Sequence, residues 1–229
     1  MSVRQRVSAV LFDLDGTLVD SLEDILDALN RALEAHGLPA SALTKTRSLI
    51  GHGSHHLVRG AVGDQGPVEV VRDRFLAEYS SRLTHKTRAY PGVVPFLHAM
   101  KNAGIATGVA TNKPGLLARA LLDELGLSAL FGAVSGGDEA PRKPEPHLLH
   151  LTLRRLGIPS PPEDGAVVYV GDMPVDVQAA KVAGCRFMGA GWGFGADRSQ
   201  GEEWFDQPED LLSALALDAR TVAGKNEGG

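Results

Sequence analysis

Short apolar segments alternate with longer amphipathic segments along most of this chain, and no other feature constrains its fold as strongly. The short segments are residues 7–12, 106–110, 133–135, 166–170 and 185–189. The longer segments each stop before a glycine, and they are residues 94–103, 114–125, 145–156 and 174–183. Because strands that alternate with helices form parallel sheets with helices on both faces, the sequence predicts an α/β fold built on a parallel sheet.

One interval interrupts the alternation, between the first predicted strand and Pro91. Apolar residues recur there at helical spacing, in residues 22–33 behind a predicted Asp20-Ser21 cap and in residues 68–83. We therefore expect a helical cap domain of residues 19–86 over the carboxyl edge of the sheet. The core domain then comprises residues 1–18 and 87–229. Its last residues, 224–229, contain no apolar anchor and are expected to be frayed.

Composition and charge exclude several classes of function. The net charge of -5 argues against broad nucleic-acid binding, which needs a basic face. No apolar run approaches the roughly 20 residues of a membrane span, and the N-terminal run is too short and too acidic for a signal peptide. A single cysteine, Cys185, fits a reducing compartment. We expect a cytoplasmic protein without nucleic-acid or membrane partners, either a monomer or a homodimer.

Polar residues gather directly after the predicted strands. Asp13 and Asp15 follow the first strand, and Thr111 follows the second. Open α/β sheets bind ligands outside the carboxyl ends of their strands, where the loops from separate strands converge. We therefore expect these three residues to share one site with four others: Asn112, Lys143, Asp172 and Asp176.

The chemistry of this set points to a metal and a phosphate group. Several carboxylates in one place repel one another unless a cation lies among them, and one lysine does not balance them. Oxygen ligands without nearby Cys or His favour Mg²⁺ over Zn²⁺. Mg²⁺ beside Lys143 and the hydroxyl of Thr111 makes a phosphate site. Asp13 can then attack phosphorus, while Asp15 protonates the leaving oxygen and later activates water.

Four segments resemble the motifs of haloacid-dehalogenase (HAD) superfamily phosphatases and occur in that family's order. They are residues 13–21 (DLDGTLVDS), 111–113 (TNK), 143–146 (KPEP) and 171–176 (GDMPVD). The resemblance implies a Rossmann-like α/β core with a small helical cap inserted after the first strand. It also implies a Mg²⁺-dependent phosphomonoester hydrolase that acts through an aspartyl-phosphate intermediate on a small phosphorylated metabolite.

The resemblance further implies a role for each acidic position. Asp13 is expected to be the nucleophile and a Mg²⁺ ligand. Asp15 is expected to be the general acid/base and to offer its main-chain carbonyl to the metal. Asp172 is expected to bind Mg²⁺ directly, whereas Asp176 acts through water or orients the motif lysine.

The remaining motif residues are expected to hold the phosphoryl group. The resemblance implies that the Thr111 hydroxyl and the Asn112 N–H bind phosphate oxygens. It implies that Lys143 fixes the nucleophile and balances the charge of the phosphate. Thr111 and Lys143 therefore count among both the catalytic and the substrate-binding candidates.

The first expected substrate is 2-phosphoglycolate. Residues 135–138 (SGGD) and 50–53 (IGHG) look most like those of phosphoglycolate phosphatases. A small carboxylate-bearing substrate needs a cationic or hydroxyl-bearing contact from the cap. The candidates for that contact are Arg47, Ser48, His52 and Ser54.

Three histidines, His52, His55 and His56, also form a cluster with zinc-ligand character. The glycines and serine around them favour a cap loop instead, with the histidines at the solvent or at the edge of the substrate. The sequence does not settle whether this cluster has a role.

Several alternative functions stay open at this point. Sugar-phosphate phosphatases, pyrophosphatases and β-phosphoglucomutase-like mutases of the same superfamily keep both acids of the first motif, so cap residues decide among them. Dehalogenases and phosphonate-cleaving enzymes lack an acid at the position of Asp15. A phospho-receiver module, which is not an enzyme, places an acidic pair first and its phosphorylated Asp later. The order here is Asp, Thr, Lys, Asp.

Overall fold

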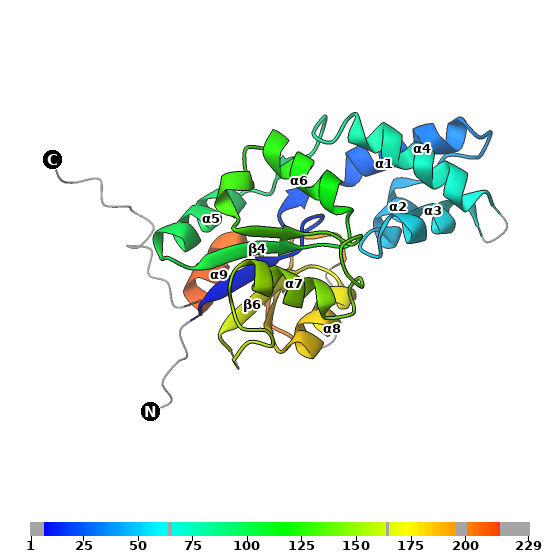
Figure 1. The fold of residues 1–229 in the computed structure, drawn as a ribbon. Helices are drawn as coiled ribbons and strands as arrows, with labels where there is room; N and C mark the ends of the chain where they lie inside the picture. The colour runs from blue at the N-terminus through cyan, green and yellow to red at the C-terminus, as the bar shows by residue number, and fades with distance from the viewer. Residues whose placement is uncertain (1–6, 64–65, 164, 196–200, 216–229) are drawn as a thin grey trace, which may run out of the picture.

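A six-stranded sheet forms the centre of the computed structural model, which describes residues 7–63, 66–163, 165–195 and 201–215 (Figure 1). The strands lie in the order β5-β4-β1-β6-β7-β8, and every neighbouring pair is parallel. They are β1 (Ala9–Phe12), β4 (Ala106–Ala110), β5 (Ala133–Ser135), β6 (Val167–Gly171), β7 (Arg186–Ala190) and β8 (Trp204–Phe205). Because β1 lies between β4 and β6, the loops that follow these three strands meet at one edge.

Helices cover both faces of the sheet, since its strands are apolar on both sides. Val10 and Phe12 of β1 face a cluster that α5, α6 and α9 complete, whereas Ala9 and Leu11 face a second cluster with α7 and α8. All four β1 residues are at most 1% exposed, which confirms the predicted buried strand. The helical segments that cover the two faces are α5 (Val93–Asn102), α6 (Gly115–Glu124), the 3₁₀ turn η1 (Ser128–Leu130), α7 (His147–Arg155), α8 (Pro174–Ala183) and α9 (Pro208–Ala214).

Four further helices form a separate layer between β2 (Val19–Asp20) and β3 (Arg88–Ala89), two short strands that pair antiparallel. In Figure 1 these helices lie to the upper right of the sheet, and α1 and α3 both pack against α4. They are α1 (Leu22–Glu34), α2 (Leu43–Leu49), α3 (Ser54–Val62) and α4 (Val68–Ser80). The structure thus confirms an α/β core with a helical cap inserted after the first strand. The limit of that cap at residues 19–86 stays a prediction.

The sequence missed the two short cap helices, α2 and α3. In α2 only Thr46 is buried, so the helix has no apolar stripe to detect. In α3, Gly60 lowers the helix propensity. A Cβ at Gly60 would lie 2.4 Å from a methyl carbon of Leu49, so the glycine allows α2 and α3 to pack closely. Within the described part of the chain, no helix has both the length and the apolar character of a membrane span.

The remaining differences between the sequence-based prediction and the structure concern short strands and the start of α1. Strands β2, β3 and β8 are each two residues long, which is too short to show alternation in the sequence. At the start of α1 the predicted Asp20-Ser21 cap is half right. The Leu22 N–H donates to Asp20 Oδ1 at 3.3 Å, but the Ser21 hydroxyl makes no capping bond and turns to another carboxylate. Residues 224–229, predicted to be frayed, lie outside the described residues.

Asp24, in the first turn of α1, fixes the path by which the chain returns from the cap to the core. Its carboxylate is 4% exposed and accepts hydrogen bonds from the N–H groups of Lys86 and Thr87 and from the Thr87 hydroxyl, at 2.7–3.0 Å. A buried carboxylate is tolerated only when its oxygens are satisfied in this way. These bonds therefore hold the segment before β3 against α1.

We expect Asp24→Ala to lower the free energy of unfolding by about 2–3 kcal/mol, because it leaves buried N–H and hydroxyl groups without an acceptor. Equilibrium unfolding in urea measures the change. Glu23→Ala is the matched control, since Glu23 is 67% exposed and pairs with Lys86 at the surface. Its cost is expected to stay below about 1 kcal/mol. Equal effects of the two substitutions would contradict the role assigned to Asp24.

Candidate active site

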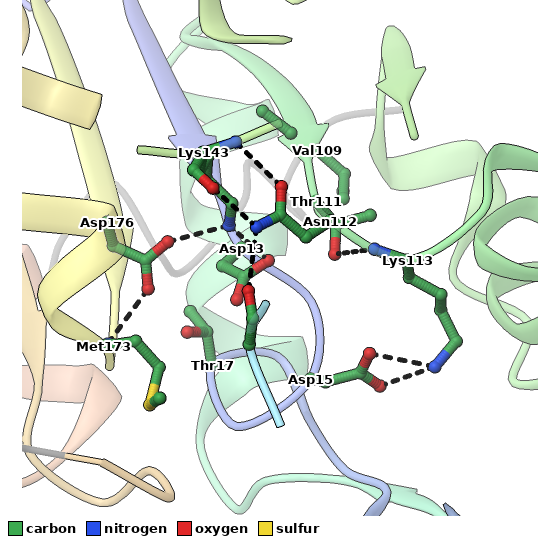
Figure 2. A network of polar contacts seen from close by, with 12 residues as sticks. Asp13, Asp15, Thr17, Val109, Thr111, Asn112, Lys113, Lys143, Met173 and Asp176 are labelled. Carbon is green, nitrogen blue, oxygen red and sulfur yellow. Dashed lines mark hydrogen bonds and ion pairs between the residues drawn. The ribbon is translucent and has the colours of Figure 1, made fainter. Parts of the chain in front are cut away.

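The predicted site residues converge where β1, β4 and β6 end, although they come from distant parts of the sequence (Figure 2). Asp13 directly follows β1, and Thr111 directly follows β4. Asp172 follows β6, and Asp176 lies in the first turn of α8. Parallel strands deliver all four side chains to one edge of the sheet, as the sequence predicted.

Three carboxylates make up the centre of the site. Asp13, Asp172 and Asp176 each offer an oxygen within 4.8 Å of the others. Their exposed fractions are 4%, 0% and 0%, so water screens their mutual repulsion very little. Such an arrangement requires positive charge nearby.

Lys143 supplies part of that charge. Its ammonium lies 2.8 Å from Asp13 Oδ1 and 2.7 Å from Asp176 Oδ1, and it donates a hydrogen bond to the Tyr169 hydroxyl at 2.8 Å. The side chain is 1% exposed. Asn112 holds the lysine backbone from both sides: its Nδ2 donates to the Lys143 carbonyl, and its Oδ1 accepts from the Lys143 N–H. The predicted motif lysine is therefore fixed between the nucleophile candidate and α8.

The protonation equilibria show that one lysine is too little. Burial raises the pKa of Asp13 to about 6, against the opposing effect of Lys143. Burial also raises the pKa of Asp172 well above its ordinary value, and the charges of Asp176 and Asp13 add to the rise. Burial disfavours the charged form of Lys143, but its two carboxylate partners outweigh burial and raise its pKa. If all three acids were ionised, they would therefore carry more negative charge than Lys143 neutralises.

The donor set fits a hard divalent cation. Asp13 Oδ1 is buried and has no partner in hydrogen-bond geometry, although it is ion-paired to Lys143. Asp176 differs, because its Oδ1 binds Lys143 and its Oδ2 accepts from the Met173 N–H at 3.0 Å, which caps α8. Asp13 is thus better placed than Asp176 to offer an oxygen to a metal. A ligand set made only of oxygens favours Mg²⁺.

Asp172 is oriented by the loop that follows β7. Its Oδ2 accepts hydrogen bonds from the N–H groups of Phe194 at 2.8 Å and Gly195 at 3.4 Å, and its Oδ1 accepts from the Thr17 hydroxyl at 3.0 Å. The backbone approaches the carboxylate closely at Gly16 and Gly193. A Cβ at either glycine would lie 2.4 Å or less from an Asp172 atom. The site therefore needs glycine at both positions.

Asp15 has a separate environment beside the acidic centre. Lys113 Nζ lies 2.8 and 2.9 Å from its two oxygens, and the Ser21 hydroxyl donates to Oδ1 at 2.6 Å. Lys113 also donates to the hydroxyl of Tyr79, a residue of cap helix α4. Lys113 is the last residue of the second motif, but no role was predicted for it. Its adjacency to Thr111 and Asn112 was the available signal.

A cavity of about 50 Å³ opens beside these residues, between the cap and the core. One side is lined by site residues that include Asp13, Asp15, Thr111 and Asn112. The other side is lined by cap residues, mostly apolar. They are Ile25, Ile50, Gly51, Gly53, Ser54, Leu57, Phe75, Leu76 and Tyr79.

The predicted cap contacts fall into two groups. Ser54 lines the cavity, but Arg47, Ser48 and His52 are not among its lining residues. The Arg47 guanidinium donates to the main-chain carbonyls of Phe194 and Gly193, at 2.9 and 3.0 Å, so it ties α2 to the loop that orients Asp172. The Ser48 hydroxyl donates to the carbonyl of Lys45 in its own helix. Substrate contacts by Arg47 and His52 stay predictions.

The histidine cluster is only partly in a loop. His52 precedes α3, as predicted, but His55 and His56 lie in the first turn of that helix, which begins at Ser54. The interpretation of His55 and His56 as loop residues was therefore wrong. The rings of His52 and His56 lie 4.7 Å apart, and His55 contacts Glu69 of α4 at 3.2 Å.

Comparisons with known proteins agree with this geometry. Residues 10–190 match the model of a family described as haloacid dehalogenase-like hydrolase. Phosphoglycolate phosphatase 1 of Pseudomonas aeruginosa is 38% identical over 225 residues, which cover 93% of this chain and 81% of that protein. N-acetylmuramic acid 6-phosphate phosphatase of the same organism is 31% identical over 221 residues, covering 93% and 96%.

A solved structure extends the likeness to three dimensions. The crystal structure of a protein described as a predicted phosphoglycolate phosphatase from Haemophilus somnus superposes with a TM-score of 0.83. The two sequences are 29% identical, and the superposition covers 91% of this chain and 97% of that one. The cap and the core are therefore both shared with that protein.

We expect Mg²⁺ to raise the melting temperature more at about pH 7.5 than at about pH 5. The raised pKa values of Asp13 and Asp172 mean that the metal-free fold prefers these acids protonated. Metal-free stability is therefore lost as the pH rises through the folded pKa of about 6. A cation needs the same acids ionised, so its effect grows over that range. Thermal denaturation with and without Mg²⁺ measures this difference.

Two variants make that measurement specific. Asp172→Asn is expected to abolish most of the shift caused by Mg²⁺. Asp210→Asn, at an exposed position of α9, is expected to keep it. A shift of the same size at both pH values, or one retained in Asp172→Asn, would contradict the proposed metal site.

Proposed function

Because the chain belongs to the haloacid dehalogenase-like hydrolase family, we propose that it is the Mg²⁺-dependent phosphatase of 2-phosphoglycolate, acting through an aspartyl-phosphate. Relatives that align over most of its length are named phosphatases, and the chain is a phosphatase of this family. The single observation that carries the proposal is the buried Asp13 carboxylate, ion-paired to Lys143 within a cluster of acids. A small phosphorylated metabolite is the partner that such a site takes.

Asp13 acts as the nucleophile. Lys143 holds its Oδ1 at 2.8 Å and Asn112 in turn holds the Lys143 backbone, so the carboxylate approaches phosphorus in a fixed orientation. The ester oxygen leaves as Asp13 forms its bond to phosphorus, and water later attacks the acyl phosphate to regenerate the carboxylate. The charge of Lys143 counters the charge of the incoming phosphoryl oxygens.

Mg²⁺ would be held by the carboxylates of Asp13 and Asp172 and by the main-chain carbonyl of Asp15. Asp176 would act through water, since one of its oxygens is already ion-paired to Lys143 and the other caps α8. When bound, the ion offsets the repulsion between the nucleophile and the phosphate. Asp176 also keeps Lys143 in place, at 2.7 Å.

Asp15 serves as general acid and base. Its carboxylate lines the same cavity as Asp13, within reach of a leaving group. In this structure Lys113 and Ser21 hold that carboxylate. The Thr111 hydroxyl and the Asn112 N–H are our candidates for binding phosphate oxygens, since both residues line the cavity beside the nucleophile.

The names of the aligned relatives support a small leaving group. Several of them are named phosphoglycolate phosphatases. We therefore favour a two-carbon acid over the alternatives left open by the sequence, namely sugar phosphates, pyrophosphate and a mutase reaction on a sugar. A location in the reducing cytoplasm belongs to the same proposal, since Cys185 is a free, buried thiol.

We expect Asp13→Asn to lower kcat with p-nitrophenyl phosphate and Mg²⁺ by at least about a thousandfold, because the amide cannot form the covalent intermediate. Steady-state release of p-nitrophenol measures it. Asp210→Asn is the control and is expected to retain the wild-type rate. A rate of Asp13→Asn within tenfold of the wild type would contradict the covalent mechanism.

The substrate is tested with a panel of phosphate esters compared by kcat/KM. We expect 2-phosphoglycolate to have a higher kcat/KM than glucose 6-phosphate, N-acetylmuramic acid 6-phosphate and pyrophosphate, because only its leaving group is a small carboxylate, which can pair with the lysine that lines the cavity. Chelation by EDTA is expected to stop hydrolysis, and added Mg²⁺ to restore it. A receiver module would show one turnover at most. A higher kcat/KM for any of the three competitors would exclude 2-phosphoglycolate as the preferred substrate.

A further inference from the structure

One cation lines the cavity among the described residues, and it comes from the core, not from the cap. That cation is Lys113, whose side chain is 5% exposed. Lys143 does not line the cavity, and neither does Arg47. If the substrate carries a second anionic group in this cavity, Lys113 is the cationic side chain that can pair with it.

The donors of Lys113 are all engaged in this structure. An ammonium has three hydrogens to donate, and Lys113 Nζ lies 2.8 and 2.9 Å from the two oxygens of Asp15 and 2.8 Å from the Tyr79 hydroxyl. A single oxygen of Asp15 suffices to keep an ion pair. One N–H can therefore pass from Asp15 to an incoming carboxylate without leaving the lysine unpaired.

Tyr79 supplies a second donor at the same place. Its hydroxyl accepts from Lys113 and still carries its own hydrogen, and its side chain lines the cavity. Burial raises the pKa of Tyr79 to about 12, so the hydroxyl stays protonated at neutral pH. Stacking on Phe75, with ring centroids 5.8 Å apart, orients the phenol ring. Lys113 from the core and Tyr79 from cap helix α4 thus form a pair of adjacent donors.

The position of this pair selects the length of the substrate. Asp15, the proposed proton donor, must lie against the ester oxygen, and Lys113 is in direct contact with Asp15. In the phosphate ester of a 2-hydroxy acid, one carbon separates the ester oxygen from the carboxyl carbon. A carboxylate oxygen is then three bonds from the ester oxygen, so it stays near Asp15 and the lysine that contacts it. In a longer acid more bonds separate the carboxylate from the ester oxygen, which places it farther from this contact.

We propose that Lys113 and Tyr79 bind the carboxylate of the substrate and restrict it to phosphate esters of 2-hydroxy acids. The inference rests on the proposed function. It places the cationic contact for the carboxylate at Lys113 of the core, whereas the sequence had suggested cap residues for that contact. Ile25, Leu57 and Leu117 are apolar residues that line the same cavity as the pair. They offer no other partner to a carboxylate and keep the dielectric low, which strengthens the ion pair.

The same contact links substrate choice to catalysis and to closure of the cap. When the carboxylate takes one N–H of Lys113, one oxygen of Asp15 is freed to face the ester oxygen. Tyr79 reaches the site only because α4 packs over it, so the pair is complete when cap and core are in contact as they are here. A substrate without a carboxylate leaves Lys113 bound to both oxygens of Asp15.

The test compares two esters of equal length, 2-phosphoglycolate and 2-hydroxyethyl phosphate, in which a neutral alcohol replaces the carboxylate. We expect the wild type to favour 2-phosphoglycolate by at least about tenfold in kcat/KM. Lys113→Met keeps the length of the side chain without its charge, and it is expected to reduce that ratio by about 10- to 100-fold. Most of the loss is expected as a higher KM for 2-phosphoglycolate.

Companion variants separate recognition from a general loss of structure. Lys113→Arg is expected to keep more of the ratio than Lys113→Met, and Tyr79→Phe to reduce it by about threefold to tenfold. Lys101→Met, the same change at an exposed position of α5, is expected to leave the ratio unchanged. If Lys113→Met does not fold, Lys113→Arg and Tyr79→Phe decide the question.

The outcomes distinguish the two proposals. A wild-type ratio near one, or a ratio unchanged in Lys113→Met or Tyr79→Phe while both esters are still hydrolysed, would overturn the carboxylate pair and leave the phosphatase intact. The absence of Mg²⁺-dependent turnover of both esters and of p-nitrophenyl phosphate would overturn the proposed function, and the pair with it.

Discussion

The ion pairs of Lys143 with Asp13 and Asp176 are the interaction on which the rest of the site depends. Without them, three buried carboxylates would meet at one sheet edge with no protein cation among them. The pairing is incomplete, because burial still raises the pKa of Asp13 and Asp172. A divalent cation would offset the negative charge that these acids carry when ionised, so the imbalance that costs stability is also what would favour metal binding.

The fold tolerates these buried carboxylates because protein groups donate hydrogen bonds to the oxygens of Asp176 and Asp172. Asp176 caps α8 with one oxygen and holds Lys143 with the other, and Asp172 is fixed by the backbone of the loop after β7. A second lysine, Lys113, neutralises Asp15 in the same manner but at the wall of the cavity. The two lysines therefore have separate positions: Lys143 is buried beside Asp13, and Lys113 lines the cavity beside Asp15, where Tyr79 of the cap contacts it.

The sequence predicted the core more fully than the cap. Strands β4 and β5 appear at their predicted residues and α8 has its predicted limits, because a strand buried on both faces and a helix between proline and glycine carry strong local signals. In the cap, α2 and α3 were missed, since the seven residues of α2 bury only Thr46 and Gly60 weakens α3. Arg47, a candidate for substrate contact, donates to the main-chain carbonyls of Gly193 and Phe194, which no local pattern predicted, and its contact with the substrate stays a prediction.

The sequence by itself determined which acids, lysine and threonine follow the strands, and it thereby determined the class of chemistry. Parallel strands must bring such residues to one edge whatever the details of their packing. Only the tertiary structure decided the partners: that Ser21 turns to Asp15 instead of capping α1, and that Lys113 contacts both Asp15, 98 residues away in the chain, and Tyr79, 34 residues away. These contacts depend on how α4 packs over the sheet edge. That packing arises from many weak apolar contacts between distant segments, and no local pattern in the sequence records it.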